Sequence, residues 1–231
     1  MKCLLFSVDD YGVEVKKVSR IDQQQHAMKS GVIRNLDTVL ENCRLAISEI
    51  SQRLSDDEMP KHVVMGLAGE YIQGVSIVVN YQRDENYQTE VSEKEQKKII
   101  SDIEEKIETS GKEDLSQRIG LSNEDIEILH ITKTGLEIGG MPVDSLIGYK
   151  GRDVKLNYYA SFAPKTYVEA LRKLALDLKL NVIGIVAQPF AVARAYSGSS
   201  SRDFSAMFVD IGGGTTDIAV VDQGSVVETK M

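Results

Sequence analysis

The residues best suited to chemistry lie in one glycine-rich stretch near the C-terminus, FVDIGGGTTDIAVV. Two apolar runs flank three glycines and two threonines: Gly212, Gly213, Gly214, Thr215 and Thr216. A two-residue hairpin turn usually needs one glycine beside Asn or Asp, so three glycines exceed what a turn requires. Because these residues lack a Cβ atom, their backbone N–H groups can crowd around a bound anion. The stretch therefore predicts a phosphate-binding hairpin.

The side chains around the glycines extend this prediction. Thr215 and Thr216 carry hydroxyl donors suited to phosphate oxygens, and Asp210 could hold a hydrated Mg²⁺ against those phosphates. These residues together suit a di- or triphosphate. Asp217, at the other end of the glycine turn, is predicted to hydrogen-bond the turn. The alternative is a loose hairpin whose glycines only close the turn. The sequence matches neither a P-loop, which needs GxxxxGK, nor a Rossmann turn, which opens a helix.

Apolar spacing predicts the helices that would position this hairpin. A first helix should begin near Asn35, a suitable N-cap with Asp37 in the first turn. The pattern from Ser92 to Glu95 has the form of a capping box, and residues 110–125 are expected to be a loop. The helix opened at Ser92 should bury one isoleucine face: Ile99, Ile100, Ile103 and Ile107.

Alternation of apolar and polar residues predicts the strands. A strand–turn–strand opens the chain, with Asp9, Asp10 and Gly12 supplying the turn. A helix should follow Pro164, and Pro189 suits the first turn of a short helix just before the hairpin. Strands are expected over residues 2–8, 13–20, 62–69, 75–81, 126–140, 152–163 and 181–186.

The composition indicates a folded protein and argues against two classes of function. The chain has 231 residues, of which 42% are hydrophobic and 27% charged, enough for one large domain or two small ones. A formal net charge of −8 and the lack of a Lys/Arg block argue against nucleic-acid binding. No apolar run reaches the roughly 18 residues of a membrane span. Two cysteines, and three histidines far apart, predict a reducing cytoplasm and no zinc site.

The hairpin and the order of segments resemble a known superfamily. VDIGGGTTDIAVV is similar to the second phosphate-binding hairpin of the actin, sugar-kinase and heat-shock-chaperone ATPases, and QPFAVARAY resembles the helix before it. SLIGYKGRDVKLNYYASFAPK is similar to part of the small insertion domain of the FtsA family of bacterial cell-division proteins. Four further segments resemble that family, in the same order: SGVIRNLDTVLENCRLAISEI, HVVMGLAGEYIQGVSIVVNYQR, DIEILHITKTGLEIGG and NVIGIVAQPFAVARAYSG. The resemblance extends to PilM, a pilus-assembly relative.

The resemblance implies an α/β fold: an actin-like (ribonuclease-H-like) ATPase domain with a small inserted α+β domain of strand-helix-strand-strand order. Residues 1–80 and 164–200 would form the first actin-like subdomain, 81–163 the insertion, and 201–231 the start of a second subdomain with the phosphate hairpin. The family's first phosphate hairpin, of the Asp-x-Gly-Thr type, and everything beyond the third strand of a meander are not found in the sequence. The chain is therefore expected to be a truncated piece of such a protein.

The resemblance also implies a function. FtsA-like proteins bind ATP, polymerise, and tether the FtsZ ring to the inner face of the cell membrane during septum formation. ATP and Mg²⁺ are the implied cofactors, and FtsZ, other division proteins and further copies of the chain are the implied partners. The location implied is the cytoplasm, at the membrane face, with attachment through a C-terminal amphipathic helix that this sequence does not contain.

Site residues carry over through the hairpin motif. Asp210 would position Mg²⁺ and water, the three glycines would cradle the β- and γ-phosphates, and Thr215 and Thr216 would contact them. Gln188 stands where the superfamily often has Glu. Its amide can orient water but cannot act as a general base, so at most weak ATP hydrolysis is expected.

Three other functions fit parts of the sequence. A PilM-like pilus component would share the fold but capture a short peptide from a membrane partner. A small-molecule kinase would share the phosphate hairpins, although residues 81–163 fit FtsA better. An interaction module that has lost nucleotide binding is the third, and there the insertion would contact division partners.

Overall fold

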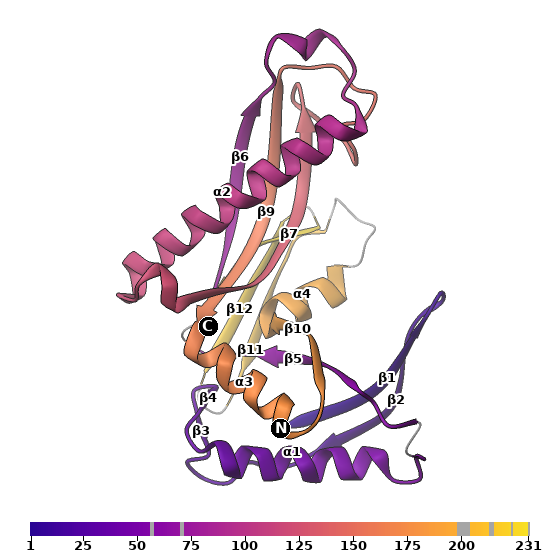
Figure 1. The fold of residues 1–231 in the computed structure, drawn as a ribbon, viewed down its shortest axis with the longest axis vertical. Helices are drawn as coiled ribbons and strands as arrows, with labels where there is room; N and C mark the ends of the chain where they lie inside the picture. Colours follow the sequence, from indigo (N-terminus) through magenta and orange to yellow (C-terminus); the bar gives the residue numbers. More distant parts are fainter. Residues whose placement is uncertain (56–57, 70–71, 198–203, 213–214, 223, 231) are drawn as a thin grey trace. The chain divides into compact units, whose positions relative to one another are not determined.

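The computed structural model describes residues 1–55, 58–69, 72–197, 204–212, 215–222 and 224–230 (Figure 1). The chain forms two compact units. The first comprises residues 1–65 and 166–185, and the second comprises residues 66–165 and 186–231. The three-part division expected from the sequence stays a prediction.

The first unit begins with an antiparallel hairpin of β1 (Lys2–Asp9) and β2 (Gly12–Arg20). Asp9 closes the turn, because its Oδ1 accepts hydrogen bonds from the N–H groups of Tyr11 at 2.9 Å and Gly12 at 3.1 Å. Gly12 has a φ of 131°, in the region that favours glycine. The predicted strand–turn–strand is confirmed.

Helix α1 (Leu36–Ser51) begins where its cap was predicted. The Asn35 Oδ1 accepts a hydrogen bond from the N–H of Thr38 at 3.0 Å, which satisfies one of the free donors of the first turn. Asp37 lies in that first turn, where a carboxylate favours the helix dipole. The apolar side that α1 buries is Val39, Leu40, Ala46 and Ile50.

The rest of the first unit consists of short strands and one helix. Its elements are β3 (Met28–Lys29), β4 (Val32–Ile33), β5 (His62–Leu67), α3 (Lys165–Asp177) and β10 (Asn181–Ala187). Strands β5 and β10 pair with each other. Helix α3 buries Val168, Leu171, Leu174 and Ala175.

The second unit is built on a seven-stranded sheet in the order β11-β12-β13-β6-β9-β7-β8. β6 and β9 run antiparallel from the pair Gln73 and Phe162 to the pair Gln82 and Asp153. The strands are β6 (Gln73–Gln82), β7 (Ile126–Ile138), β8 (Met141–Pro142), β9 (Asp153–Pro164), β11 (Ala206–Ile211), β12 (Thr216–Asp222) and β13 (Ser225–Lys230). β13 joins β6 through the pairs that Glu228 and Thr229 form with Val75 and Gly74.

Helix α2 (Glu93–Ile119) covers one face of β6, β9 and β7 (Figure 1). Its Ile99, Ile103 and Ile107 are buried as predicted, against the alternate residues of β9 that point to this face, whereas Ile100 is only partly buried. Those β9 residues are Val154, Leu156, Tyr158, Ala160 and Phe162. Ser92 caps the helix through its side chain, which accepts a hydrogen bond from the N–H of Glu95 at 3.2 Å.

The prediction of a loop over residues 110–125 is wrong, because α2 continues to Ile119. Gly111 is buried within the helix, and a Cβ added there would lie 2.2 Å from Cζ of Phe162. The glycine therefore lets the helix approach β9 closely. Helix α2 ends at Gly120, which has a φ of 70° and donates its N–H to the Ser116 carbonyl at 2.9 Å. Two short 3₁₀ helices, Glu85–Gln88 and Asn123–Asp125, lie in the loops before and after α2.

Arg83, which follows β6, is buried with 2% of its surface exposed. Its Nε and Nη2 bind the two carboxylate oxygens of Glu95 at 2.7 Å and 3.1 Å. Its Nη1 donates to the carbonyls of Thr89 and Gly151, each at 3.1 Å. A planar guanidinium can satisfy all these acceptors at once, so Arg83 ties two loops to the start of α2.

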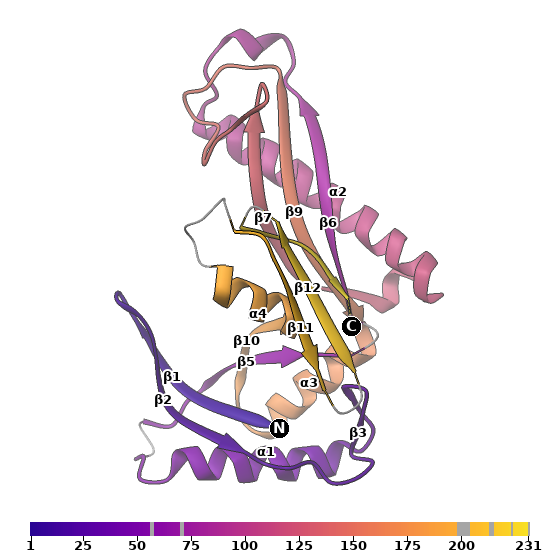
Figure 2. The same ribbon diagram turned by 180° about the vertical axis from the view of Figure 1, so that it is seen from behind.

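Helix α4 (Gln188–Ser197) packs on the opposite face of the sheet from α2 (Figure 2). Phe190 stacks on Tyr159 of β9 with ring centroids 4.5 Å apart. The Tyr159 hydroxyl lies 2.7 Å from Oγ1 of Thr229 on β13. This packing holds the first turn of α4 beside the β11–β12 hairpin.

No helix within the described residues is long and apolar enough to cross a membrane.

Candidate nucleotide-phosphate site

The predicted phosphate hairpin forms as two antiparallel strands, β11 and β12. Asp210 pairs with Asp217, and Ile211 pairs with Thr216, directly before the connecting residues. The N–H of Gly212 donates to the Thr215 carbonyl at 2.9 Å. Since this bond occupies the Gly212 donor, contacts to an anion would fall to the threonine hydroxyls and the remaining glycines of the motif.

The structure brings most of the predicted site residues to one turn. Asp210, Gly212, Thr215 and Thr216 lie within the hairpin, and Thr216 is exposed. The two other glycines of the motif, at positions 213 and 214, lie outside the described residues. The assignment of these six positions to phosphate and Mg²⁺ therefore remains a prediction.

Gln188 reaches the hairpin from α4. Its Nε2 donates a hydrogen bond to Oδ2 of Asp210 at 3.2 Å, across 22 positions of sequence. The contact depends on α4 lying on the sheet, which the stacking of Phe190 on Tyr159 secures. Two residues that were singled out from separate motifs, the amide before Pro189 and the carboxylate at the strand end, thus lie in direct contact.

Asp217 was predicted to hydrogen-bond the turn, and this stays a prediction because two turn residues lie outside the described range. The side chain is buried, with 6% of its surface exposed, and its Oδ1 has no hydrogen-bond partner among the described residues. Burial, and next the charge of Asp210 across the strand pair, raise the pKa of the Asp217 carboxyl above its ordinary value. Like charges directly opposite in a sheet destabilise it, so this pair is costly without a cation.

The two carboxylates provide a test of whether Mg²⁺ fits the hairpin. Mg²⁺ prefers oxygen ligands and is usually bound by one or two carboxylates, with phosphate oxygens and waters completing the shell. Asp210 and Asp217 supply two carboxylates, of which Asp217 has an unpaired, buried oxygen. The described residues contain no group of three or more His, Cys, Asp or Glu that could hold a metal alone. The residues therefore fit a Mg²⁺ ion that arrives with phosphates rather than a permanent metal centre.

Sequence reasoning did not predict that Asp217 is buried opposite Asp210. The signal was present in the spacing, because Asp210 and Asp217 are placed symmetrically about the glycine turn. In an antiparallel hairpin two such residues face each other. The burial of Asp217 depends on tertiary packing and could not be obtained from the spacing.

No protein-family model matches the chain. The chain is 24% identical to the cell division protein FtsA of Neisseria meningitidis serogroup B over 204 residues, which is 88% of this chain and 45% of that protein. It is also 24% identical to FtsA of Agrobacterium fabrum over 210 residues, or 90% of this chain and 43% of that protein. The chain is distantly similar to FtsA. It spans less than half the length of these relatives.

A solved structure has a similar fold. It is described as a PilM-PilN type IV pilus biogenesis complex, and the match covers 99% of this chain and 57% of the other with a TM-score of 0.65. Sequence identity is 11%, so the match concerns the fold. The mixed α/β architecture resembles the actin-like fold of PilM, in agreement with the class predicted from the sequence. The similarity to FtsA and PilM that was inferred from the motifs is confirmed.

Proposed function

We propose that the chain is the nucleotide-binding part of an FtsA-like, actin-like scaffold that binds ATP with Mg²⁺. The observation that carries the proposal is the pair of facing carboxylates, Asp210 and Asp217, on a glycine-rich hairpin with Gln188 beside them. A Mg²⁺ ion bound with the β- and γ-phosphates would neutralise this pair. The threonine hydroxyls at positions 215 and 216 would donate to the phosphate oxygens.

The residues near the hairpin favour a switch over a turnover enzyme. The Gln188 amide donates to Asp210 and so orients that carboxylate. An amide has no basic group that could accept a proton from water, so it supplies positioning without general-base catalysis. We expect nucleotide to bind and to be hydrolysed slowly, with the bound nucleotide controlling assembly.

The partners in this proposal follow from the distant similarity to FtsA. The intact protein would polymerise, contact the FtsZ ring and act at the cytoplasmic face of the cell membrane. A second candidate is a PilM-like pilus component, favoured by the fold match to the PilM-PilN complex. Pull-down with FtsZ against pull-down with a peptide of a pilus membrane partner separates the two.

Isothermal calorimetry with Mg²⁺-ATP tests nucleotide binding by the chain. We expect binding that Gly213→Val abolishes, because a branched side chain would fill the space of the phosphates. Gly66→Val is the matched control, since a Cβ at Gly66 meets no atom within 4 Å. Absence of heat with the unsubstituted chain would contradict the proposal, and would leave an interaction module that does not bind nucleotide.

A further inference from the structure

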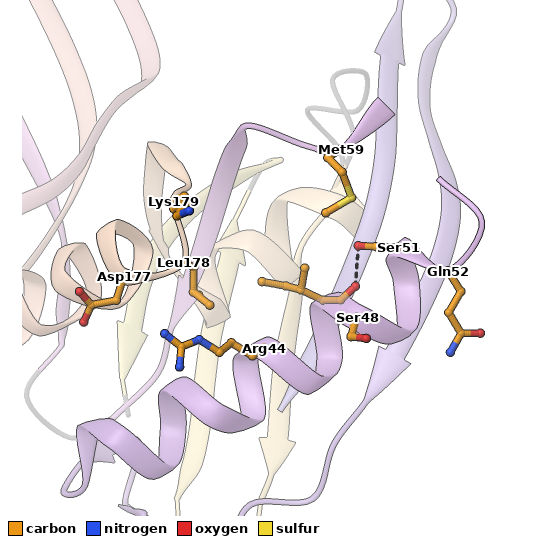
Figure 3. Close-up of a pocket in the computed structure, with 9 residues that line it drawn as sticks. Arg44, Ser48, Ser51, Gln52, Met59, Asp177, Leu178 and Lys179 are labelled. Atoms are coloured by element: carbon orange, nitrogen blue, oxygen red, sulfur yellow. Dashed lines mark hydrogen bonds between the residues drawn. The ribbon is translucent and has the colours of Figure 1, made fainter. Parts of the chain in front are cut away.

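A groove of about 630 Å³ lies in the first unit (Figure 3). The second half of α1 forms one wall and the end of α3 forms the other. Its volume is within the range of sites that bind ligands, about 300–1,000 Å³. The side chains that line it are Arg44, Ile47, Ser48, Ser51, Gln52, Met59, Asp177, Leu178 and Lys179.

The lining combines an apolar part with two cations. Ile47, Met59 and Leu178 supply aliphatic and thioether surface from three different segments. Arg44 extends from α1 toward the end of α3, and Lys179 follows that helix (Figure 3). A site of this kind can bury an apolar side chain while it holds an anionic group at its edge.

Both cations are available to a ligand. Within the described part of the chain, neither Arg44 nor Lys179 makes an ion pair or a hydrogen bond through its side chain. The carboxylate of Asp177 is already engaged, because its Oδ2 accepts from Nζ of Lys173 at 3.1 Å. The whole chain carries a net charge of −8, so two unpaired cations in one groove are a local reversal of charge. This favours an acidic ligand over a basic or neutral one.

The backbone at Lys179 has a conformation that lysine seldom adopts. Its φ is 58°, in the left-handed region that glycine or Asn usually occupies after the last turn of a helix. A long side chain there strains the backbone. The Lys179 N–H bonds the Leu176 carbonyl at 2.9 Å, so the conformation is part of the helix end. Lys179 therefore stands where glycine would be more stable.

We propose that this groove binds an acidic peptide segment of a partner protein. An apolar side chain of the peptide contacts Ile47, Met59 and Leu178, and a neighbouring carboxylate lies between Arg44 and Lys179. The proposal is independent of nucleotide binding, because the groove and the hairpin belong to different units of the chain.

Fluorescence anisotropy with the labelled peptide Gly-Glu-Leu-Glu-Leu-Gly tests the proposal on the whole chain. Arg44→Gln and Lys179→Gln should each weaken binding about two- to fivefold, and the double variant about tenfold. Arg20→Gln and Lys61→Gln are matched controls, because both side chains are exposed in the same unit and do not line the groove. A control peptide with glutamine in place of both glutamates should bind as weakly as the unsubstituted peptide binds the double variant.

Lys179→Gly separates binding from folding. Glycine relieves the left-handed strain, so the Tm should stay equal or rise while the peptide affinity falls as it does in Lys179→Gln. Equal affinity across all variants, equal binding of the glutamine peptide, or no binding by the unsubstituted chain would each overturn the proposal. Sedimentation with phosphatidylglycerol vesicles, if it depended on Arg44 and Lys179 without peptide binding, would overturn it in favour of an anionic membrane surface.

Discussion

At the residue scale, the facing carboxylates of the hairpin have an energetic cost that the rest of the fold must offset. Asp217 is buried, has an unpaired oxygen and lies opposite Asp210. A buried polar group without a partner costs about 1–3 kcal/mol. The hairpin is therefore expected to gain stability from any ligand that brings positive charge to this pair, which links stability to function at this site.

The pH dependence of stability follows from the pKa of Asp217. Burial and the charge of Asp210 raise this pKa in the folded chain above the ordinary value of 3.8, so the folded state binds the proton more tightly than the unfolded state does. The contribution of Asp217 to the free energy of unfolding is therefore most favourable below pH 3.8. It is lost as the pH rises through the pKa that Asp217 has in the folded chain. Asp217→Asn should raise the Tm at pH 7 by about 2–4 °C. It should also remove the part of the pH dependence of stability that comes from Asp217. Thermal melts of both proteins between pH 4 and pH 7 without Mg²⁺ check this prediction. A lower Tm for the variant than for the unsubstituted chain at pH 7 would contradict it.

Arg83 is the other residue with a large predicted effect. Its guanidinium binds both oxygens of Glu95 and reaches two loop carbonyls, and 2% of its surface is exposed. Arg83→Lys keeps the charge but not the planar fork, so we expect the free energy of unfolding to fall by about 3 kcal/mol. Urea denaturation measures this change. Lys97→Gln, in an exposed pair on α2, is the control and should change stability by less than about 0.5 kcal/mol.

At the element scale, the sequence determines some features directly and leaves others to packing. The Asn35 cap and the alternation along β9 depend on local chemistry and period, so both could be predicted. The last turns of α2 could not, because glycine, serine and charged residues over 110–119 have no strong apolar period. Their helix is stabilised through contact with β9, where Gly111 meets Phe162.

The α2 contact predicts a reversal of ordinary helix propensity. Gly→Ala inside a helix normally stabilises by about 1 kcal/mol. At Gly111 the added Cβ would lie 2.2 Å from the Phe162 ring, so we expect Gly111→Ala to lower the free energy of unfolding by about 1–3 kcal/mol. Ser110→Ala, at the exposed neighbouring position, should instead raise it slightly. Urea denaturation of both variants checks the pair; a stabilised Gly111→Ala would show that α2 does not approach β9 this closely.

At the scale of the whole molecule, the sheet of the second unit ends in a strand, β11, whose outer edge pairs with no other strand of the described residues. β11 is the first strand in the order of the seven-stranded sheet, and its Met207, Val209 and Ile211 are more than half exposed. Exposed apolar edge strands favour pairing with another chain.

The exposed edge predicts self-association. Analytical ultracentrifugation should show oligomers whose proportion rises with concentration, and Val209→Lys should shift the population toward monomer because a charged side chain opposes strand pairing. Val78→Lys is the matched control: Val78 is 53% exposed and Val209 52%, but Val78 lies on an interior strand. A monomeric unsubstituted chain, or an equal effect of both variants, would contradict the prediction.

The most direct test of the account is whether the facing carboxylates make ATP binding depend on Mg²⁺. Calorimetric titration with ATP, in Mg²⁺ and in EDTA, should be made on the unsubstituted chain, Asp210→Asn, Asp217→Asn and the control Asp222→Asn, an exposed residue of the same strand. We predict that Mg²⁺ tightens ATP binding at least about tenfold in the unsubstituted chain and in Asp222→Asn, and that either hairpin variant loses this gain. Equal affinities with and without Mg²⁺, or hairpin variants that keep the full gain, would contradict the assignment of this hairpin to a Mg²⁺-nucleotide.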